Sequence, residues 1–394
     1  MANSFDAIVV GLGAMGSAAA YQLSLRGKRV VGLEAFTPAH DMGSSHGSSR
    51  IIRQAYYEHP SYVPLVLRAY ELWERLQADT GSDLLCLTGG LSLGLPDSRL
   101  VAGSIKSARE HGLDHQILEA AQIKQRFPQF VPSNDEIALY ETKAGYLRPE
   151  ECIRQHLAEA GRLGAQLRFE EPMVSWTADS SGEGVTVNGA RQTYHAKSLI
   201  LSTGAWAPEV IAQLRLPIRP YRRVMFWFDP VGGIAPFLPA QCPIYLWEPW
   251  GEAQIVYGFP ATDGRHRGAK VALHLGHEAC TPDSIDRNIR QDDELAIRSV
   301  IANRIPALNG RLIDARTCMY TMTPDGHFII ECHPEYPQVT IAAGFSGHGF
   351  KFASAVGEIL ADLAIERNTN HNIALFSSRR FERPELTQVT VRRQ

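Results

Sequence analysis

The sequence predicts an α/β fold, α+β overall, with two hydrophobic cores: a discontinuous parallel-sheet domain and a second domain built on a mixed sheet. Three observations support this prediction. The 394 residues exceed what one ordinary core accommodates. Residues 6–35 read as strand, glycine turn, helix and strand, which is typical of a parallel sheet with crossover helices. Residues 220–317 hold aromatic-rich strand-forming runs, which suit an antiparallel arrangement around a pocket.

The composition is that of a globular enzyme. Hydrophobic residues make up 44% and charged residues 21%, and 33 Gly and 23 Pro are scattered along the chain. Because 39 Lys and Arg oppose 42 Asp and Glu, for a net charge of -3, neither nucleic acid nor an anionic membrane is expected as a partner. No run approaches the roughly 20 apolar residues that a membrane-spanning helix needs.

The cysteines and the N-terminal segment indicate a reducing compartment. Six cysteines occur, at positions 86, 152, 242, 280, 318 and 332, and none forms a Cys-x-x-Cys pair. The early apolar segment "AIVVGLGAMGSAAAYQL" lacks a basic leader and is interrupted by glycines, so we interpret it as core rather than as a secretion signal. We therefore expect a cytoplasmic protein, and we predict no metal site.

Residues 6–35, "DAIVVGLGAMGSAAAYQLSLRGKRVVGLEA", contain three glycines in Gly-x-Gly-x-x-Gly spacing between a β-rich run and a helical one. Gly11 permits a tight turn, and Gly13 lets the backbone approach a pyrophosphate. Gly16 lets helix and strand pack closely. The free N–H groups at the start of the helix would face the phosphates.

A second strand, residues 29–33, ends on Glu34, about 20 residues after the glycines. A carboxylate in that place accepts hydrogen bonds from a ribose 2′-hydroxyl and repels a 2′-phosphate. The order of strand, glycines, helix, strand and acid predicts a Rossmann-like dinucleotide site. From the motif alone, FAD, NAD and a structural relic remain open.

The middle of the chain suggests that this domain is interrupted. Residues 43–76 begin rich in Gly and Ser and take helical spacing from Tyr62. Residues 146–219 read as helix, glycine break, strand, hairpin and a buried strand in "KSLILSTGAW", the order found in the second half of a large FAD-binding domain. Residues 86–145 would then be an excursion into the second domain.

Residues 339–364, "VTIAAGFSGHGFKFASAVGEILADLA", predict a second backbone cradle. A β run ends at Gly344, the loop holds Gly347 and Gly349, and a helix begins near Phe352. Such a loop suits an electron-rich group that gains negative charge. The alternative is a glycine-rich turn before a packed helix.

Four segments occur together in the order and spacing of one known family: "GLGAMG" with Glu34, "GSSHGSSRIIR", "CMYTMTPDGHFII" and "AAGFSGHGFKFAS". The chain resembles the monomeric sarcosine oxidase and N-methyltryptophan oxidase family of flavoprotein amine oxidases from about residue 5 to about residue 375. The resemblance implies FAD, an FAD-binding domain of the glutathione-reductase type, and a catalytic domain with a mixed sheet over the flavin. The implied FAD-binding domain comprises residues 1–85, 146–219 and 318–394, and the implied catalytic domain comprises 86–145 and 220–317.

The resemblance implies that Cys318 is joined through its sulfur to the 8α-methyl carbon of FAD. A thiolate must attack that carbon while the far end of the ring takes up electron density, so nearby cations should assist. His46, Arg50 and Lys351 are the candidates in matching motifs. Outside this motif, Cys318 would be interpreted as a small buried hydrophobic residue.

The implied substrates are secondary amino acids, N-methylated or cyclic, held by their carboxylate. Arg53 and Lys351 match the clamping pair, because an arginine fork with an ammonium group is a good carboxylate receptor. Either could instead be a solvated surface charge. Tyr257, His274 and Tyr320 fall where the family lines its pocket, and His274 could equally be structural.

Lys270, in "GAKVALH", matches a family lysine that stabilises superoxide character during reoxidation by O₂. The catalytic residues that the resemblance implies are Lys270, Arg50, His46, Tyr257 and His274. The implied cofactor-binding residues are Cys318, Gly11, Gly13, Gly16, Glu34, Ser49, Val174, Gly347, His348 and Gly349.

The sequence departs from the family pattern in two loops. "GSSHGSSR" stands where the family has "GSHHGDTR", so Ser45 replaces a histidine and Ser48 an aspartate. This difference leaves open whether the flavin is fully attached. Gln54 and Tyr57 stand where the pattern favours His and Gly, in a loop that covers the substrate, so the substrate could differ from sarcosine.

The function predicted is a monomeric oxidase with covalent FAD, which transfers a hydride equivalent from a secondary amino acid to flavin N5. O₂ then reoxidises the flavin and gives H₂O₂. The enzyme would mainly position the substrate and raise the electron affinity of the flavin. The alternative is a flavoprotein dehydrogenase, or a subunit that passes electrons to a partner protein.

Overall fold

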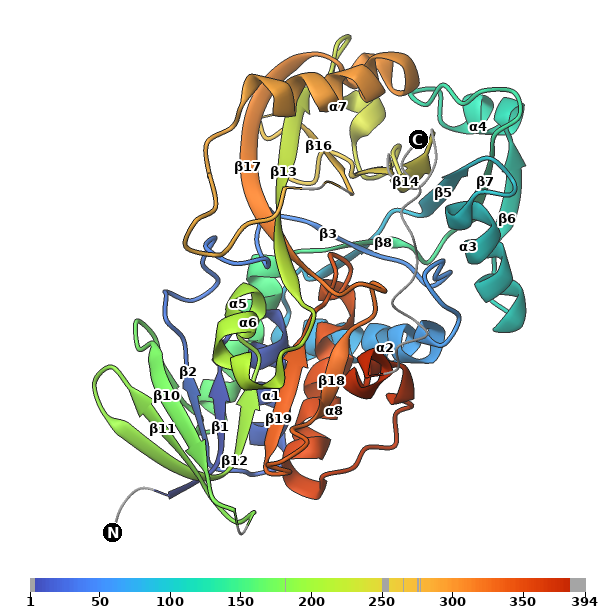
Figure 1. Cartoon of the computed structure of the whole chain (residues 1–394). Helices are drawn as coiled ribbons and strands as arrows, with labels where there is room; N and C mark the ends of the chain where they lie inside the picture. The colour runs from blue at the N-terminus through green and yellow to red at the C-terminus, as the bar shows by residue number, and fades with distance from the viewer. Residues whose placement is uncertain are drawn as a thin grey trace.

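The computed structural model describes residues 4–180, 182–249, 255–264, 266–274, 276 and 278–382. Two eight-stranded sheets and a small three-stranded sheet form its frame, and helices pack against them (Figure 1). The α/β fold predicted from the sequence is confirmed.

The first sheet has a parallel centre in the order β19-β12-β1-β2-β9. Three further strands, β10, β11 and β18, pair antiparallel at its margins. The strands are β1 (Ser4–Val10), β2 (Val30–Leu33), β9 (Gln166–Arg168), β10 (Met173–Ala178), β11 (Val185–Gly189), β12 (Thr193–Leu201), β18 (Ile329–Cys332) and β19 (Val339–Ala343). The central strands are almost wholly buried, as parallel strands between helical layers must be.

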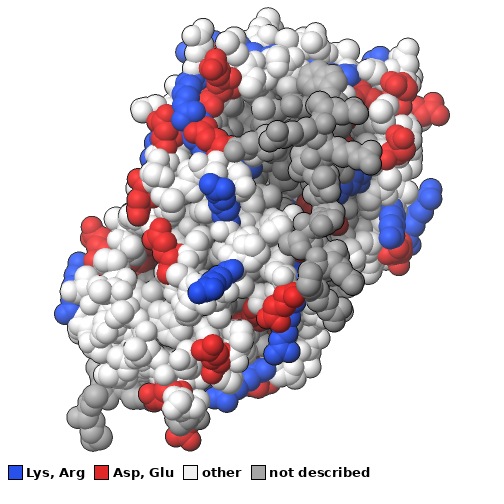
Figure 2. Space-filling model, viewed as in Figure 1, with Lys and Arg blue, Asp and Glu red and all other residues white. Residues whose placement is uncertain are grey.

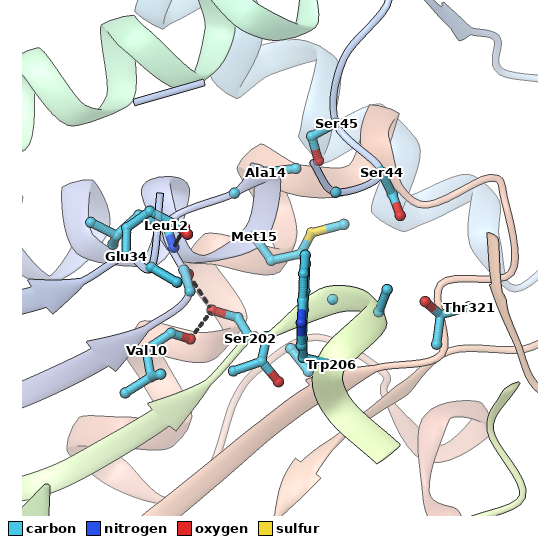
Figure 3. A pocket seen from close by; sticks show the side chains of 18 of the residues that line it. Val10, Leu12, Ala14, Met15, Glu34, Ser44, Ser45, Ser202, Trp206 and Thr321 are labelled. Atoms are coloured by element: carbon cyan, nitrogen blue, oxygen red, sulfur yellow. Dashed lines mark hydrogen bonds between the residues drawn. The ribbon is translucent and has the colours of Figure 1, made fainter. Parts of the chain in front are cut away.

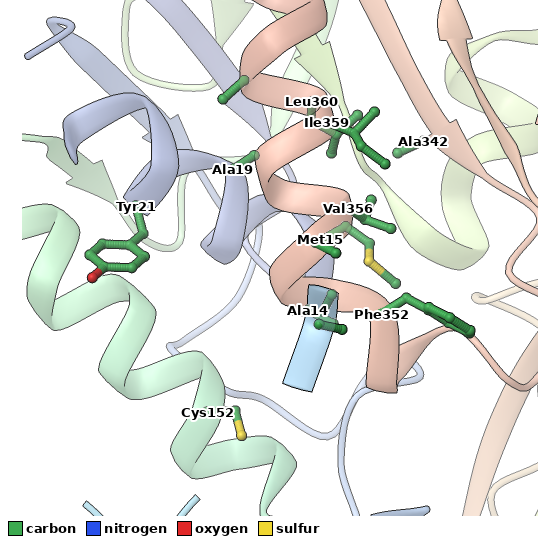
Figure 4. Close-up of a cluster of buried hydrophobic side chains, with 14 of the residues drawn as sticks. Ala14, Met15, Ala19, Tyr21, Cys152, Ala342, Phe352, Val356, Ile359 and Leu360 are labelled. Atoms are coloured by element: carbon green, nitrogen blue, oxygen red, sulfur yellow. The ribbon is translucent and has the colours of Figure 1, made fainter. Parts of the chain in front are cut away.

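The helices associated with this sheet are α1 (Ala14–Leu25), α2 (Tyr62–Thr80), α5 (Pro149–Arg162), the short α6 (Ala207–Val210) and α8 (Ala353–Glu366). Small residues let α1 and α8 approach closely, since a Cβ on Gly357 would lie 2.5 Å from that of Ala18. Figure 4 shows Met15 and Ala19 of α1 clustered with Val356 of α8. This packing fixes α1, whose N-terminus begins at the glycine turn.

The second sheet runs in the order β17-β13-β16-β15-β14-β5-β7-β6. Its strands are β5 (Gly90–Gly94), β6 (Gln116–Glu119), β7 (Ile137–Glu141), β13 (Arg219–Asp229), β14 (Ile244–Glu248), β15 (Val256–Gly258), β16 (Ala269–Leu273) and β17 (Arg311–Met322). We expected an antiparallel arrangement for residues 220–317, and their pairing agrees. The pair β14–β5 is parallel, and it joins this segment to residues 86–145, the predicted excursion. Helices α3 (Arg99–Glu110), α4 (Ala120–Arg126) and α7 (Gln291–Arg304) pack beside this sheet.

The third sheet, β3 (Arg50–Ile52), β8 (Gly145–Leu147) and β4 (Leu85–Leu87), lies between the two larger ones (Figure 1). The long strands β13 and β17 extend from the upper part of the molecule toward the lower one. Our proposed boundary between residues 317 and 318 falls inside β17, which pairs with β13 along its length. The assignment of the five segments to two domains remains a prediction.

On the face shown in Figure 2, basic and acidic side chains are interspersed rather than gathered into a field of one sign. No helix in the described ranges is both long enough and apolar enough to cross a membrane. All six cysteines are free thiols in the structure.

Candidate active site

A cavity of about 670 Å³ opens at the carboxyl ends of β1, β2, β12 and β19. This edge is where open α/β sheets bind ligands. The cavity extends from the glycine turn and Glu34 to Arg50, Tyr320 and the loop at residues 344–350. In Figure 3, Glu34 lies at one end, Ser44 and Thr321 at the other, and Trp206 and Met15 between them. An elongated molecule such as a dinucleotide fits this outline.

The glycine turn has the geometry that its spacing predicts. Gly11 has a φ of +84°, and a Cβ on Gly16 would lie only 1.8 Å from the Gly11 carbonyl oxygen. A Cβ on Gly13 would find only the Ser45 hydroxyl, at 3.8 Å, among the described atoms within 4 Å. Gly13 is also the N-cap of α1 and provides no side-chain cap, so the first N–H groups of the helix are free for an anion. These features fit a pyrophosphate.

Glu34 is buried at the rim of this turn. Its Oε2 accepts a hydrogen bond from the Leu12 N–H at 2.8 Å, and its Oε1 accepts one from Phe36 at 3.2 Å. His40 Nε2 lies 3.4 Å from the same Oε1. These contacts hold the carboxylate at the cavity wall, as ribose recognition requires. Val174, on β10, also lines the cavity and exposes 71% of its surface.

Replacement of Gly16 by alanine is expected to abolish flavin binding, because the new Cβ would overlap the Gly11 backbone rather than a movable side chain. The measurement is the ratio of flavin absorbance to protein absorbance after purification. Gly161→Ala is the control, since no described atom lies within 4 Å of its Cβ position. Normal flavin content in Gly16→Ala would contradict the assignment of this turn.

The register of the second sheet brings many of the predicted residues onto one face. Arg223 lies opposite Cys318, Trp227 opposite Lys270, and Tyr221 opposite Tyr320. Directly opposed residues, and residues two apart along a strand, point to the same face of a sheet. The cluster of Met225, Trp227, Ala272, Cys318 and Tyr257 occupies this face. The structure therefore places the cysteine, the lysine and the aromatic residues on one face of the sheet.

Cys318 is 2% exposed and lies beside Arg50. The Arg50 Nη2 is 3.7 Å from the Cys318 sulfur and donates to the Ser44 carbonyl at 3.0 Å. A guanidinium next to a thiol favours the thiolate. The neighbouring guanidinium suits a reactive cysteine.

Lys270 is buried beneath the loop that precedes β3. Its Nζ donates to the carbonyls of Gly47 and Ser49, at 2.8 and 2.7 Å, and lies 3.3 Å from the Ser49 hydroxyl. Glu150, in the first turn of α5, accepts the N–H groups of Gly47 and Ser48 and so fixes the loop. Ser48 has a φ of +64°. Sequence reasoning missed Glu150, whose only signal was its place after Pro149 at a helix start.

His46 requires a correction. Burial, followed by the charges of Arg50 and Lys270, lowers the pKa of His46 to about 3. The imidazole is therefore neutral near pH 7 and does not provide the cation that we expected from it. Neither ring nitrogen has a hydrogen-bond partner among the described residues.

Tyr257, Tyr320 and His274 form an aromatic group, as predicted. The Tyr320 hydroxyl donates to the Tyr257 hydroxyl at 3.3 Å, and the His274 ring centroid lies 5.7 Å from that of Tyr320. Burial lowers the pKa of His274 to about 4, so its ring is neutral near pH 7. A Cβ on Gly347 would lie 2.3 Å from the Tyr320 ring, so the glycine loop lies directly against this group.

Arg53 and Lys351 lie against one ring, that of Tyr56, at 4.3 and 5.2 Å from its centroid. Both are buried rather than solvated. Arg53 Nη2 pairs with Glu58 at 2.6 Å, a partner that sequence reasoning missed although it lies only five residues away. Lys351 Nζ donates to the His348 carbonyl at 2.8 Å.

The side chain of His348 turns toward Tyr56 and toward the Gly326 carbonyl, which its Nε2 contacts at 2.9 Å. Gly347 and Gly349 line the cavity, but His348 is absent from the described lining. Through these contacts His348 anchors the loop at residues 344–350. That His348 binds the cofactor remains a prediction from the sequence.

Comparison with known proteins adds to this geometry. A family model described as "FAD dependent oxidoreductase" matches residues 6–363. The chain is 51% identical over 381 residues to a monomeric sarcosine oxidase of Streptomyces avermitilis, covering 96% of this chain and 98% of that protein. It is 32% identical over 388 residues to an N-methyl-L-tryptophan oxidase of Yersinia pestis, covering 96% and 99%.

Among solved structures, the chain is similar to NikD, an amino acid oxidase essential for nikkomycin biosynthesis, in its open form. The TM-score is 0.83, the identity 22%, and the coverage 95% of this chain and 97% of that one. At this identity the similarity supports the fold alone. It agrees with a Rossmann-like domain joined to a mixed-sheet domain.

Proposed function

Since the chain belongs to the family of FAD-dependent oxidoreductases, alongside monomeric sarcosine oxidases and N-methyl-L-tryptophan oxidases, we propose that it is a flavin-dependent oxidase of secondary amino acids, N-methylated or cyclic. One observation supports this proposal above all. A single sheet face carries the Cys318 thiol, the buried Lys270 amine and the aromatic residues, and its Tyr320 lines the cavity.

Different cavity residues would bind different parts of FAD. The glycine turn and the free N–H groups of α1 would bind the pyrophosphate, and Glu34 the ribose. Cys318 would attach the flavin through a thioether, with the Arg50 guanidinium beside the sulfur. Bound FAD would supply a two-electron acceptor that O₂ can reoxidise.

The substrate carboxylate would bind between Arg53 and Lys351. Both cations are buried, so an anionic ligand there gains more than it would in water. Glu58 holds the Arg53 guanidinium in place, and Arg53 in turn lowers the pKa of Glu58 to about 2 although burial opposes it. The aromatic group of Tyr257, Tyr320 and His274 would then surround the secondary amine. Because His274 stays neutral, it adds no charge that would repel a cationic amine.

The pH profile offers a test of the clamp. Burial, followed by the charge of Arg53, lowers the pKa of Lys351 to about 7. Lys351 therefore loses its proton as pH rises through about 7, and kcat/KM for sarcosine is expected to fall above that pH because the carboxylate loses one cation. In Lys351→Met this limb should vanish, with kcat/KM lower by roughly 10²-fold, as expected for losing one partner of a buried charge pair. Steady-state rates between pH 6 and 10 measure both effects, with Lys197→Met as an exposed control. An unchanged limb in Lys351→Met would exclude Lys351 from the clamp.

The proposal itself is tested by peroxide release and O₂ consumption with sarcosine, N-methyl amino acids, pipecolate and proline. Oxidase activity predicts one H₂O₂ per substrate oxidised. Turnover with an artificial acceptor but not with O₂ would favour the alternative dehydrogenase. We also propose a monomer, since the Streptomyces relative is named as monomeric.

A further inference from the structure

Arg223 occupies an unassigned position at the centre of the site. It lies on β13 directly opposite Cys318. Its Nε donates to the His274 carbonyl at 3.3 Å, and its guanidinium carbon lies 5.0 Å from the Tyr320 ring centroid. The guanidinium is therefore next to the same aromatic group that would surround the substrate amine.

This arginine is buried without a countercharge among the described residues. It is 6% exposed, and among the described residues its hydrogen bonds go to the carbonyls of Arg222 and His274 alone. The two other buried arginines of this kind each hold a carboxylate: Arg53 pairs with Glu58 at 2.6 Å, and Arg222 with Asp293 at 2.8 Å. A buried cation that lacks such a partner is costly. An anion brought by a ligand would remove that cost.

Arg223 and the Arg53–Lys351 clamp are linked through the aromatic group and the glycine loop. The His274 carbonyl accepts a hydrogen bond from the Arg223 Nε at 3.3 Å, and the His274 ring centroid lies 5.7 Å from that of Tyr320. Tyr320, whose ring faces Arg223, lies against Gly347 of the loop that leads to Lys351. A ligand held by its α-carboxylate at the clamp would therefore extend past the aromatic group toward Arg223.

We infer that Arg223 binds a second carboxylate, at the far end of the substrate side chain, so that the preferred substrates are acidic secondary amino acids such as N-methyl-aspartate and N-methyl-glutamate. This inference rests on the proposed oxidase function and names its substrate class. The reaction is otherwise unchanged: the CH–NH unit loses two electrons and two protons to become an imine, O₂ takes them up as H₂O₂ by way of the flavin, and the carboxylate at Arg223 takes no part in the redox step.

The Cys318 sulfur is the other anion that Arg223 could serve. Arg50 already contacts that sulfur at 3.7 Å. The sulfur also loses its charge once a thioether forms, which would leave Arg223 unpaired in the working enzyme. A substrate carboxylate is the countercharge that remains available during turnover.

The experiment compares N-methyl-L-glutamate with its neutral isostere N-methyl-L-glutamine, with sarcosine as a third substrate. The native enzyme should prefer the glutamate derivative in kcat/KM, and Arg223→Gln should lower the glutamate-to-glutamine ratio by roughly 100-fold, as for one buried charge pair. Arg223→Lys should retain part of the preference. Arg316→Gln is the matched control, because it removes a partly exposed arginine from the same strand pair that is already paired with Asp314.

Binding is measured separately, by titrating the flavin absorbance of the native protein with glutarate or with butyrate. Tighter binding of glutarate, lost in Arg223→Gln, supports the inference even where a variant turns over poorly. Equal binding of the two acids, or an unchanged substrate ratio in Arg223→Gln, overturns it. A variant that only loses covalent flavin would assign Arg223 to Cys318 instead. If the enzyme oxidised none of the substrates, sarcosine included, the oxidase proposal would be refuted. The glutarate titration would still test whether Arg223 binds a second carboxylate.

Discussion

Replacing Cys318 with alanine is expected to move the yellow colour from the acid pellet to the supernatant. In the native protein a thioether would survive acid denaturation and keep the flavin with the precipitate. Without the sulfur, FAD would be held only by noncovalent contacts with the cavity wall, and these are lost when the fold is lost. The measurement is the flavin absorbance of both fractions after acid precipitation.

The physical basis is the environment of the sulfur. The Arg50 Nη2 lies 3.7 Å from the Cys318 sulfur, where a guanidinium can stabilise the negative charge that the sulfur carries as it attacks. The altered loop "GSSHGSSR" still provides the Ser44 carbonyl that holds Arg50. We therefore expect attachment to survive the serine substitutions in this loop.

Cys332→Ala is the matched control, since Cys332 is another free thiol on a strand but lies on the first sheet. It should leave the colour in the pellet. A native protein that is loaded with flavin yet gives a colourless pellet would refute attachment altogether. A pellet that stays yellow in Cys318→Ala would show that another residue holds the flavin.

The local parts of the fold could be predicted because their physics is local. Gly11, Gly13 and Gly16 predict a turn whose geometry depends on a few neighbouring atoms. Glu34 follows at the end of the next strand, at the sequence spacing that the motif requires. The excursion at residues 86–145 was inferred from the order of the elements. Its parallel pairing through β5 and β14 was not, because that contact joins segments about 150 residues apart.

The charge partners within the site were the least predictable. Glu150 reaches Gly47 across 103 residues, and the sequence gives no sign that these meet. The pKa of His46 is lowered by burial and by the charges of Arg50 and Lys270, which lie on different elements. The motif "GSSHGSSR" therefore could not predict that His46 is neutral. Arg223 was overlooked because nothing in "YRRVMF" shows which of two adjacent arginines has a carboxylate partner.

Replacing Lys270 with methionine is expected to slow reoxidation of the reduced flavin by O₂ by roughly 10²- to 10³-fold, the usual cost of removing one preorganised charge from a site where negative charge develops. The Lys270 Nζ is held by two backbone carbonyls and a hydroxyl, so it needs no reorganisation as an electron reaches O₂. Burial lowers the pKa of Lys270 well below its ordinary value. The protonated fraction therefore falls as pH rises, and reoxidation in the native enzyme should slow at high pH, whereas Lys270→Met should show no such decline.

Stopped-flow measurements separate the two half-reactions. Anaerobic reduction of the flavin by substrate should change much less than reoxidation, because Lys270 lies under the loop that precedes β3 and contacts neither Arg53 nor Lys351 in the described hydrogen-bond network. Lys197→Met, which removes an exposed lysine paired with Asp6, controls for the loss of a positive charge. If both half-reactions slowed equally in Lys270→Met, the lysine would be a structural anchor for the Gly47–Ser49 loop, and the cation that activates O₂ would have to be sought at Arg50.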